Sequence, residues 1–178
     1  MTNPKPALTP VKTLRIQARK HIEQGAVTAG YRADRRQVLK SLNEALATEI
    51  VCVLRYRRHH FMASGIQAKS IADEFMVHSI EEQGHADQIA ARIVQLGGEP
   101  DFAPDSLSRR SHAEYVAGKT LVDMIRENLV AERIAIDSYR ELIAFLGAQD
   151  PTTAQMLKGI LAVEEKHADE LADFLGRQ

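Results

Sequence analysis

The stretch that decides the fold is Glu82-Gln-Gly-His85-Ala-Asp, residues 82–87. It places a carboxylate and an imidazole three residues apart, and residues at that spacing share one face of an α-helix. Both side chains can therefore reach one metal ion. The pattern returns as Glu164-Glu-Lys-His167-Ala-Asp, residues 164–169. One Glu-x-x-His pair arises by chance in many helices, but two copies inside apolar-periodic segments indicate a site.

The duplication extends upstream of both pairs. Glu49 lies 33 residues before Glu82, and Glu132 lies 32 residues before Glu164. Each of these two single glutamates is followed seven residues later by a tyrosine, Tyr56 and Tyr139 respectively. Seven residues make about two helical turns, so each Glu and its Tyr share a face. The chain therefore repeats a pair of helices, Glu…Tyr and then Glu-x-x-His.

Together the repeats supply four glutamates and two histidines, the donor set of a di-iron or di-manganese carboxylate site in a four-helix bundle. Carboxylate oxygens and imidazoles suit iron, manganese or zinc. We expect Glu49 and Glu132 to be terminal ligands, one for each ion. Glu82 and Glu164 are expected to bridge the two ions, and His85 and His167 to bind one ion each. The six side chains leave coordination positions for O2 or peroxide. Tyr56 and Tyr139 either hydrogen-bond a bridging ligand and pass an electron, or are core tyrosines with satisfied hydroxyls.

The rest of the chain predicts an all-α fold, an antiparallel four-helix bundle with one long crossover. The expected helices span residues 34–62, 68–96, 119–146 and 151–175, and residues 98–117 form the crossover, with a helical turn at 111–116. Ser64-Gly65, Gly97-Gly98 and Gly147 are the expected stops. The predicted organisation is an N-terminal extension, residues 1–33, and a bundle domain, residues 34–178. Within the extension, a short amphipathic helix is expected from Val11 to about Gln24.

Composition limits the classes of protein. With 44% hydrophobic and 26% charged residues, the 178-residue chain is ordinary for a soluble globular protein. A single cysteine, Cys52, excludes an intrachain disulfide and any multi-cysteine zinc or iron–sulfur site. No apolar run approaches the roughly 18 residues of a membrane span, and the N-terminus lacks an apolar signal core. We expect a cytoplasmic protein without membrane contact.

Charge is unevenly distributed. Residues 1–36 carry eight Lys or Arg against two Asp or Glu, whereas residues 37–178 carry fifteen against twenty-two. A basic arm therefore precedes an acidic body. The arm either contacts nucleic acid or another acidic surface, or is a solvated tail that docks on a neighbouring subunit.

Three residues near the six-residue set carry open assignments. Cys52, one turn after Glu49, is either a redox-sensitive neighbour of the site or a small core residue. His78, one turn before Glu82, is either an extra ligand or iron-entry group, or a hydrogen-bonded or cavity-facing histidine. Its counterpart in the second repeat is Ile160, so the repeat gives it no paired role. Arg55 is expected at a solvated or interface position.

On these motifs, from residue 36 to residue 175, the sequence resembles the ferritin-like superfamily and most closely the bacterioferritins. The motifs Ala-Thr-Glu49-Ile-Val, Glu82-Gln-Gly-His85 and Glu164-Glu-Lys-His167 occur in the family's order. The resemblance implies a ferroxidase centre within each subunit. It also implies Fe(II) and O2 or H2O2 as substrates, iron storage or detoxification, and assembly into a hollow homo-oligomeric cage.

The chain departs from bacterioferritins in ways that bear on cofactor and assembly. Their haem is bound by a Met directly after the first Glu of Glu-x-x-His, where this chain has Gln83, so we expect no haem. Their short fifth helix is missing, and a basic extension is present. That combination resembles the twelve-subunit starvation-protection mini-ferritins, which can bind DNA but build their iron site between subunits. We therefore favour twelve subunits over twenty-four, and keep two rival functions: a non-storing di-iron or di-manganese oxidase or catalase, and a DNA-protecting protein.

Overall fold

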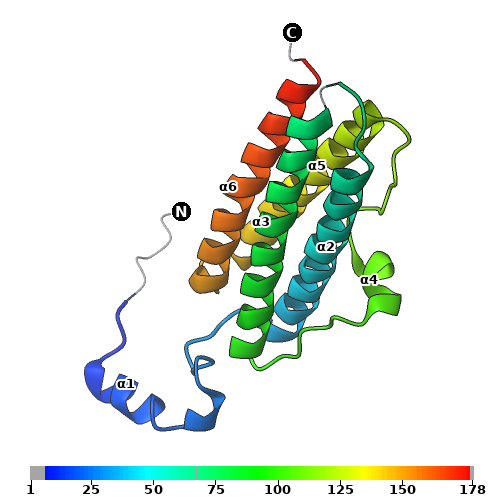
Figure 1. Ribbon diagram of the computed structural model, residues 1–178. Coiled ribbons are helices and arrows are strands. Elements are labelled where there is room, and N and C mark those ends of the chain that lie inside the picture. The colour runs from blue at the N-terminus through cyan, green and yellow to red at the C-terminus, as the bar shows by residue number, and fades with distance from the viewer. Residues whose placement is uncertain (1–6, 67, 177–178) are drawn as a thin grey trace.

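The computed structural model describes residues 7–66 and 68–176, and within these ranges the protein is all helical (Figure 1). Four long helices form the bundle: α2 (Arg35–Met62), α3 (Ala68–Gln95), α5 (Leu121–Leu146) and α6 (Pro151–Phe174). Two short helices, α1 (Val11–Gln17) and α4 (Pro104–Arg110), and a 3-10 turn, η1 (Ile22–Gln24), complete it. The predicted fold class is confirmed, and the long helices begin and end within two residues of the predicted positions.

The helices pair as two antiparallel hairpins, α2 with α3 and α5 with α6 (Figure 1). Between the hairpins, the crossover carries the chain back along the bundle, and α4 packs against α2 on the way. This connection makes α5 run in the same direction as α3, so the second hairpin runs antiparallel to the first along the bundle (Figure 1). None of the helices in the described ranges is long and apolar enough to cross a membrane.

Local sequence signals set the helix ends. The side chains of Asp34 and Asp150 each accept a hydrogen bond from a first-turn backbone amide of α2 and α6, respectively. Thr120 and Asp123 form a reciprocal capping box at the start of α5. Such caps satisfy amides that have no partner within the helix. Gly97 adopts a φ of 74° and ends α3, a backbone conformation that favours glycine.

Two expectations about short helical segments are wrong. The crossover is not helical at 111–116, and its helix lies earlier, at α4, where Pro104 begins the first turn. Residues 111–117 instead lie against α2, with the His112 amide 2.9 Å from the Thr48 hydroxyl. The N-terminal helix ends at Gln17 rather than Gln24. Every residue of α1 is exposed, and helices this short are marginal without packing.

Arg55 also contradicts its expected solvated position, because it is buried. Its Nε donates to Asn128 Oδ1 over 2.9 Å, and its Nη1 donates to the Glu114 carbonyl over 2.9 Å. His59, one turn on, contacts the same Asn128 oxygen and two carbonyls of the crossover, those of Val116 and Ala117. Arg55 and His59 thus attach the crossover to the bundle.

The apolar core is divided along the bundle axis. One cluster of buried side chains includes Leu42, Leu46, Ile89 and Leu157. A second cluster, further along the helices, includes Phe75. On every long helix, the glutamates and histidines of the six-residue set fall between the two clusters. The fold therefore holds a buried polar layer between two apolar ones.

Candidate metal centre

The structure brings all six predicted ligand residues together inside the bundle. Each is at most 5% exposed. They come from all four long helices: Glu49 from α2, Glu82 and His85 from α3, Glu132 from α5, and Glu164 and His167 from α6. The two apolar clusters pack the four helices together. All six side chains therefore project from packed helices, and none projects from a loop.

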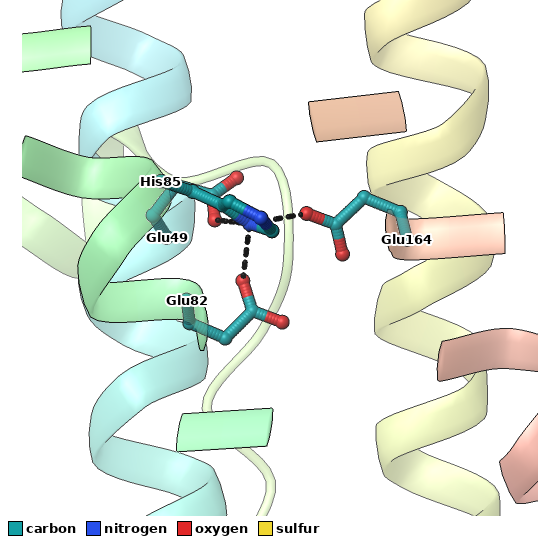
Figure 2. Close-up of side chains that lie close together, drawn as sticks. All are labelled: Glu49, Glu82, His85 and Glu164. Carbon is teal, nitrogen blue, oxygen red and sulfur yellow. Dashed lines mark ion pairs between the residues drawn. The ribbon is translucent and has the colours of Figure 1, made fainter. Parts of the chain in front are cut away.

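One half of the layer surrounds His85 (Figure 2). Its Nδ1 lies 3.3 Å from Glu49 Oε2, 3.7 Å from Glu82 Oε2 and 2.9 Å from Glu164 Oε1. Figure 2 shows Glu164 reaching towards the imidazole from the side opposite Glu49. The four ligand atoms lie within 4.8 Å of one another, which is close enough to surround one metal ion.

The other half surrounds His167. Its Nδ1 lies 3.4 Å from Glu82 Oε1, 3.9 Å from Glu132 Oε2 and 3.7 Å from Glu164 Oε2. These four residues form a second group with ligand atoms within 4.8 Å of one another. Glu82 and Glu164 belong to both groups and turn different oxygens towards each. The geometry is that of two adjoining metal positions with two shared carboxylates.

The unpaired polar atoms of the interior converge on this layer. Among the described residues, all but one of the buried side-chain polar atoms without a hydrogen-bond partner belong to it, the exception being Asn128 Nδ2. They are Glu49 Oε2, Glu82 Oε1, His85 Nδ1, Glu164 Oε1 and Oε2, and His167 Nδ1. Buried polar groups are almost always paired, since leaving one unpaired is costly. Divalent cations between these atoms would satisfy them, so the donor set fits two metal ions.

Crowding of negative charge shifts the carboxylate pKa values. Burial, and then the neighbouring charge of Glu82, raises the pKa of Glu49 well above its ordinary value. Burial and the charges of Glu49 and Glu132 raise the pKa of Glu164 to about 8. Burial acts in the same direction on Glu132, but its interactions with His167 and Glu164 lower its pKa to about 2. Without metal, the layer must therefore hold protons.

The imidazoles of His85 and His167 hold some of these protons, and their positive charge offsets the negative charge of the carboxylates. Burial alone would lower the pKa of His85, but Glu164, Glu49 and Glu82 together raise it to about 12. The pKa of His167 is likewise raised, because Glu132 and Glu164 outweigh its burial. Metal ligation needs neutral imidazole and ionised carboxylate, so a cation entering this layer would displace protons.

Two tyrosines and one further glutamate hold the layer from outside. The hydroxyls of Tyr56 and Tyr139 donate to Glu132 Oε1 and Glu49 Oε1, respectively. Glu81 Oε2 lies 2.6 Å from His167 Nε2, on the ring atom away from the layer. The sequence reasoning missed Glu81. Its place in the second repeat is taken by Val163, so the duplication gives no signal for it.

The neighbours with open assignments are also placed. Cys52 is 3% exposed, within the second apolar cluster, and its Sγ lies 3.6 Å from Arg55 Nη2. This is the position of a small core residue. His78 is buried, with its ring stacked on His167 at 3.9 Å between ring centroids. A cavity of about 180 Å³ between α2 and α5 is lined by His112 and by Tyr139, whose hydroxyl donates to Glu49, among others.

Comparison with known proteins identifies similar chains. Bacterioferritin from Mycobacterium avium is 31% identical over 147 residues, which cover 79% of this chain and 88% of the relative. A nutrient stress-induced DNA-binding protein from Synechococcus sp. is 30% identical over 142 residues, covering 78% and 81%. Among solved structures, the dodecameric thioferritin of Bacteroides fragilis, a bacterioferritin-related protein, has 32% identity and a TM-score of 0.78, with 80% and 86% coverage.

A second solved structure shares the fold. Dps from Thermosynechococcus elongatus superimposes with a TM-score of 0.76 at 22% identity, over 80% of this chain and 92% of that one. A family model described as a ferritin-like domain matches residues 39–178. The resemblance expected from the sequence is thereby confirmed: the chain belongs to the ferritin-like domain family.

Proposed function

We propose that this chain is the subunit of an iron-storage or iron-detoxifying protein that oxidises Fe(II) at a di-iron centre formed by the six-residue set. The observation that carries the proposal is the convergence of unpaired buried donor atoms from four helices on two adjoining positions. The family membership and the similarity to bacterioferritins support it.

The protein's own residues hold and orient the ions. Glu82 and Glu164 would bridge them, Glu49 and Glu132 would each bind one, and His85 and His167 would complete one each. Four carboxylates balance two divalent cations, so the loaded layer carries no net buried charge. Two Fe(II) ions held there would supply two electrons as substrate, which together with two protons would reduce O2 to hydrogen peroxide, or hydrogen peroxide to two water molecules. Tyr56 and Tyr139 keep the terminal carboxylates oriented, and Glu81 fixes the ring of His167.

Iron is the proposed metal, although manganese and zinc satisfy the same donors. Haem is not part of the proposal. The amide of Gln83 donates to Asp87 Oδ1 over 3.0 Å, and an amide is a poor ligand for haem iron. A Soret band that follows protein concentration through purification would show that this exclusion is wrong.

The test of the centre removes one shared carboxylate at a time. Glu82→Ala and Glu164→Ala should each abolish rapid Fe(II) oxidation, followed by ferric absorbance in a stopped-flow instrument, while the helical circular dichroism is kept. Glu165→Ala is the matched control, because Glu165 is the neighbour of Glu164 on α6 and pairs at the surface with Arg140. Wild-type oxidation rates in either test variant would refute the assignment.

Storage requires an enclosed volume, so we propose a homo-oligomeric cage, with twelve subunits favoured over twenty-four. Large apolar side chains lie exposed on the single chain, including Phe61, Met62 and Ile66 near the α2–α3 turn and Phe102 in the crossover. Burial between subunits would account for them. The related Bacteroides fragilis protein is a dodecamer. Light scattering decides the subunit number, and a mass of one or two chains at micromolar concentration would exclude the cage.

Two rivals remain testable. A non-storing oxidase or a manganese catalase would use the same six residues but would not accumulate a ferric core, so iron loading followed by electron microscopy separates it from the leading function. A DNA-protecting role is favoured by one observation. The basic side chains of the extension, Lys12, Arg15, Arg19 and Lys20, are exposed. A salt-sensitive gel shift that disappears when residues 1–33 are deleted would support that role.

A further inference from the structure

A second set of metal-ligating side chains lies beside the six-residue layer. Glu74 and His78 are one turn apart on α3, and Glu170 faces them from α6. The Nε2 atom of His78 is 3.0 Å from Glu170 Oε2 and 3.4 Å from Glu74 Oε1. One ligand atom from each residue lies within 4.8 Å of the others. The histidine is fully buried, whereas the two carboxylates are about one-third exposed, at 32% and 33%.

The hydrogen-bond directions around His78 place a proton on its Nδ1. Tyr56 has one hydroxyl proton and donates it to Glu132. The same hydroxyl lies 3.2 Å from His78 Nδ1, so it accepts there, and Nδ1 is the ring atom that carries hydrogen. A neutral imidazole has one N–H. In the neutral ring the Nε2 lone pair points at the two carboxylates, and Glu170 Oε2 also accepts a hydrogen bond from Lys166 Nζ over 3.2 Å.

We propose that Glu74, His78 and Glu170 bind a third divalent transition-metal ion at the surface of the bundle. One imidazole nitrogen and two carboxylates are a donor set that Fe(II), Mn(II) and Zn(II) accept. A cation between these atoms satisfies all three acceptors. Lys166 is the competing cation: its Nζ lies 3.1 Å from Glu170 Oε1 and donates to Oε2 over 3.2 Å, and its side chain is half exposed, so a metal ion would displace it.

The position of this site suggests what it does. The ring of His78 stacks on that of His167 with an angle of 22° between the planes, so the third site and the six-residue layer are separated by one pair of rings. The carboxylates of Glu74 and Glu170 face solvent, and His167 Nδ1 faces the layer. We therefore infer that this site captures Fe(II) from solution next to the centre. This role rests on the proposed ferroxidase function, whereas metal binding at the site does not depend on that function.

Zinc is the probe for binding, because it is not oxidised. Crystals of the metal-free protein soaked in zinc chloride should show three anomalous peaks per chain at the zinc edge, two in the six-residue layer and one among Glu74, His78 and Glu170. The double variant Glu74→Gln/Glu170→Gln should lose the third peak and keep the other two. Asp73→Asn/Glu165→Gln is the matched control. It removes the same charge from exposed positions on the same two helices and should keep all three peaks.

The outcomes separate this inference from the proposed function. Two peaks in the wild-type layer with none at His78 would overturn the third site and leave the ferroxidase centre intact. A peak at His78 with none in the layer would support the third site and contradict the centre. Loss of the third peak in the control double variant as well would overturn the assignment of Glu74 and Glu170 as ligands.

The capture role has its own kinetic test. In Glu74→Gln/Glu170→Gln, the initial rate of Fe(II) oxidation should fall about tenfold when Fe(II) is scarce and recover at saturating Fe(II), so that KM rises and kcat is unchanged. A site that acts on the chemistry itself would instead lower kcat. Equal rates at low Fe(II) in the test and control double variants would overturn the capture role.

Discussion

Tyr139 on α5 donates its hydroxyl hydrogen bond to Oε1 of Glu49 on α2, which leaves Oε2 of that carboxylate facing His85. Tyr56 on α2 makes the same contact in the opposite direction, to Glu132 on α5. Each tyrosine thus holds the single glutamate of the other hairpin. One carboxylate oxygen is fixed by the protein, and the other is presented to the layer.

This relationship predicts that the tyrosines act on metal affinity. Tyr139→Phe and Tyr56→Phe should each weaken zinc binding to the layer about 10-fold to 100-fold, the usual effect of removing a residue that orients a metal ligand. Titration calorimetry on the metal-free protein measures it. Tyr115→Phe is the control, since Tyr115 is exposed in the crossover. Unchanged affinity in both test variants would mean that the tyrosines only fill the core.

The six-residue set could be predicted because its motif occurs twice in the sequence. The spacing of each copy places its side chains on one helix face, whatever the details of packing. Glu81 and Glu170 could not be predicted in this way, because the other repeat has no glutamate at either position: Val163 corresponds to Glu81, and Gln88 corresponds to Glu170. Which flanking glutamate reaches His167 or His78 depends on how α3 and α6 cross, and the hydrophobic pattern of one helix does not specify that.

Arg55 is a residue whose burial could not be predicted from its residue type. It lies three residues after Cys52 and seven after Thr48, both buried, so its position on α2 already faces inward. Its charge favoured a solvated assignment, because an unpaired buried guanidinium is costly. The partners that remove that cost, Asn128 on α5 and the Glu114 carbonyl in the crossover, are 73 and 59 residues away. Only the folded crossover brings them together with Arg55.

The same cluster yields a stability prediction. Asn128 Oδ1 accepts from Arg55 Nε over 2.9 Å and lies 3.1 Å from His59 Nδ1, all within the buried interior. Asn128→Ala removes this acceptor and should lower the free energy of unfolding by about 1–3 kcal/mol. Urea denaturation at equal subunit concentration measures it, with Gln88→Ala on the exposed face of α3 as the control. Equal denaturation midpoints for wild type and Asn128→Ala would contradict the role of this acceptor.

A pH-dependent prediction follows from the cap of α6. Asp150 accepts from the amide and the hydroxyl of Thr153 and pairs with Arg92 over 2.8 Å. Burial would raise its pKa, but the bonds from Thr153 and Tyr31 and the charge of Arg92 lower it. A carboxyl whose pKa is lowered on folding stabilises the protein above its unfolded pKa, near 3.9, and loses that contribution as the pH falls through the folded pKa.

Asp150→Asn should therefore cost about 1.5–3 kcal/mol at neutral pH, the usual contribution of hydrogen bonds to a charged group. The difference from wild type should shrink steadily below about pH 4. Denaturant titrations at several pH values test both parts, and Asp87→Asn on the exposed face of α3 should show little change throughout. A difference that stays constant down to pH 3 would show that the charge of Asp150 does not contribute.

The last prediction separates the two roles considered for Cys52. Its thiol is buried in the second apolar cluster, and burial raises its pKa well above the ordinary value, against the lowering effect of Arg55. Since the thiolate is the reactive form, the native thiol should be inert. Iodoacetamide should leave folded protein unmodified for hours at pH 8 and alkylate it fully after unfolding in urea, as read by mass spectrometry. Alkylation of the native protein within minutes would instead identify Cys52 as an accessible, redox-sensitive neighbour of the metal centre.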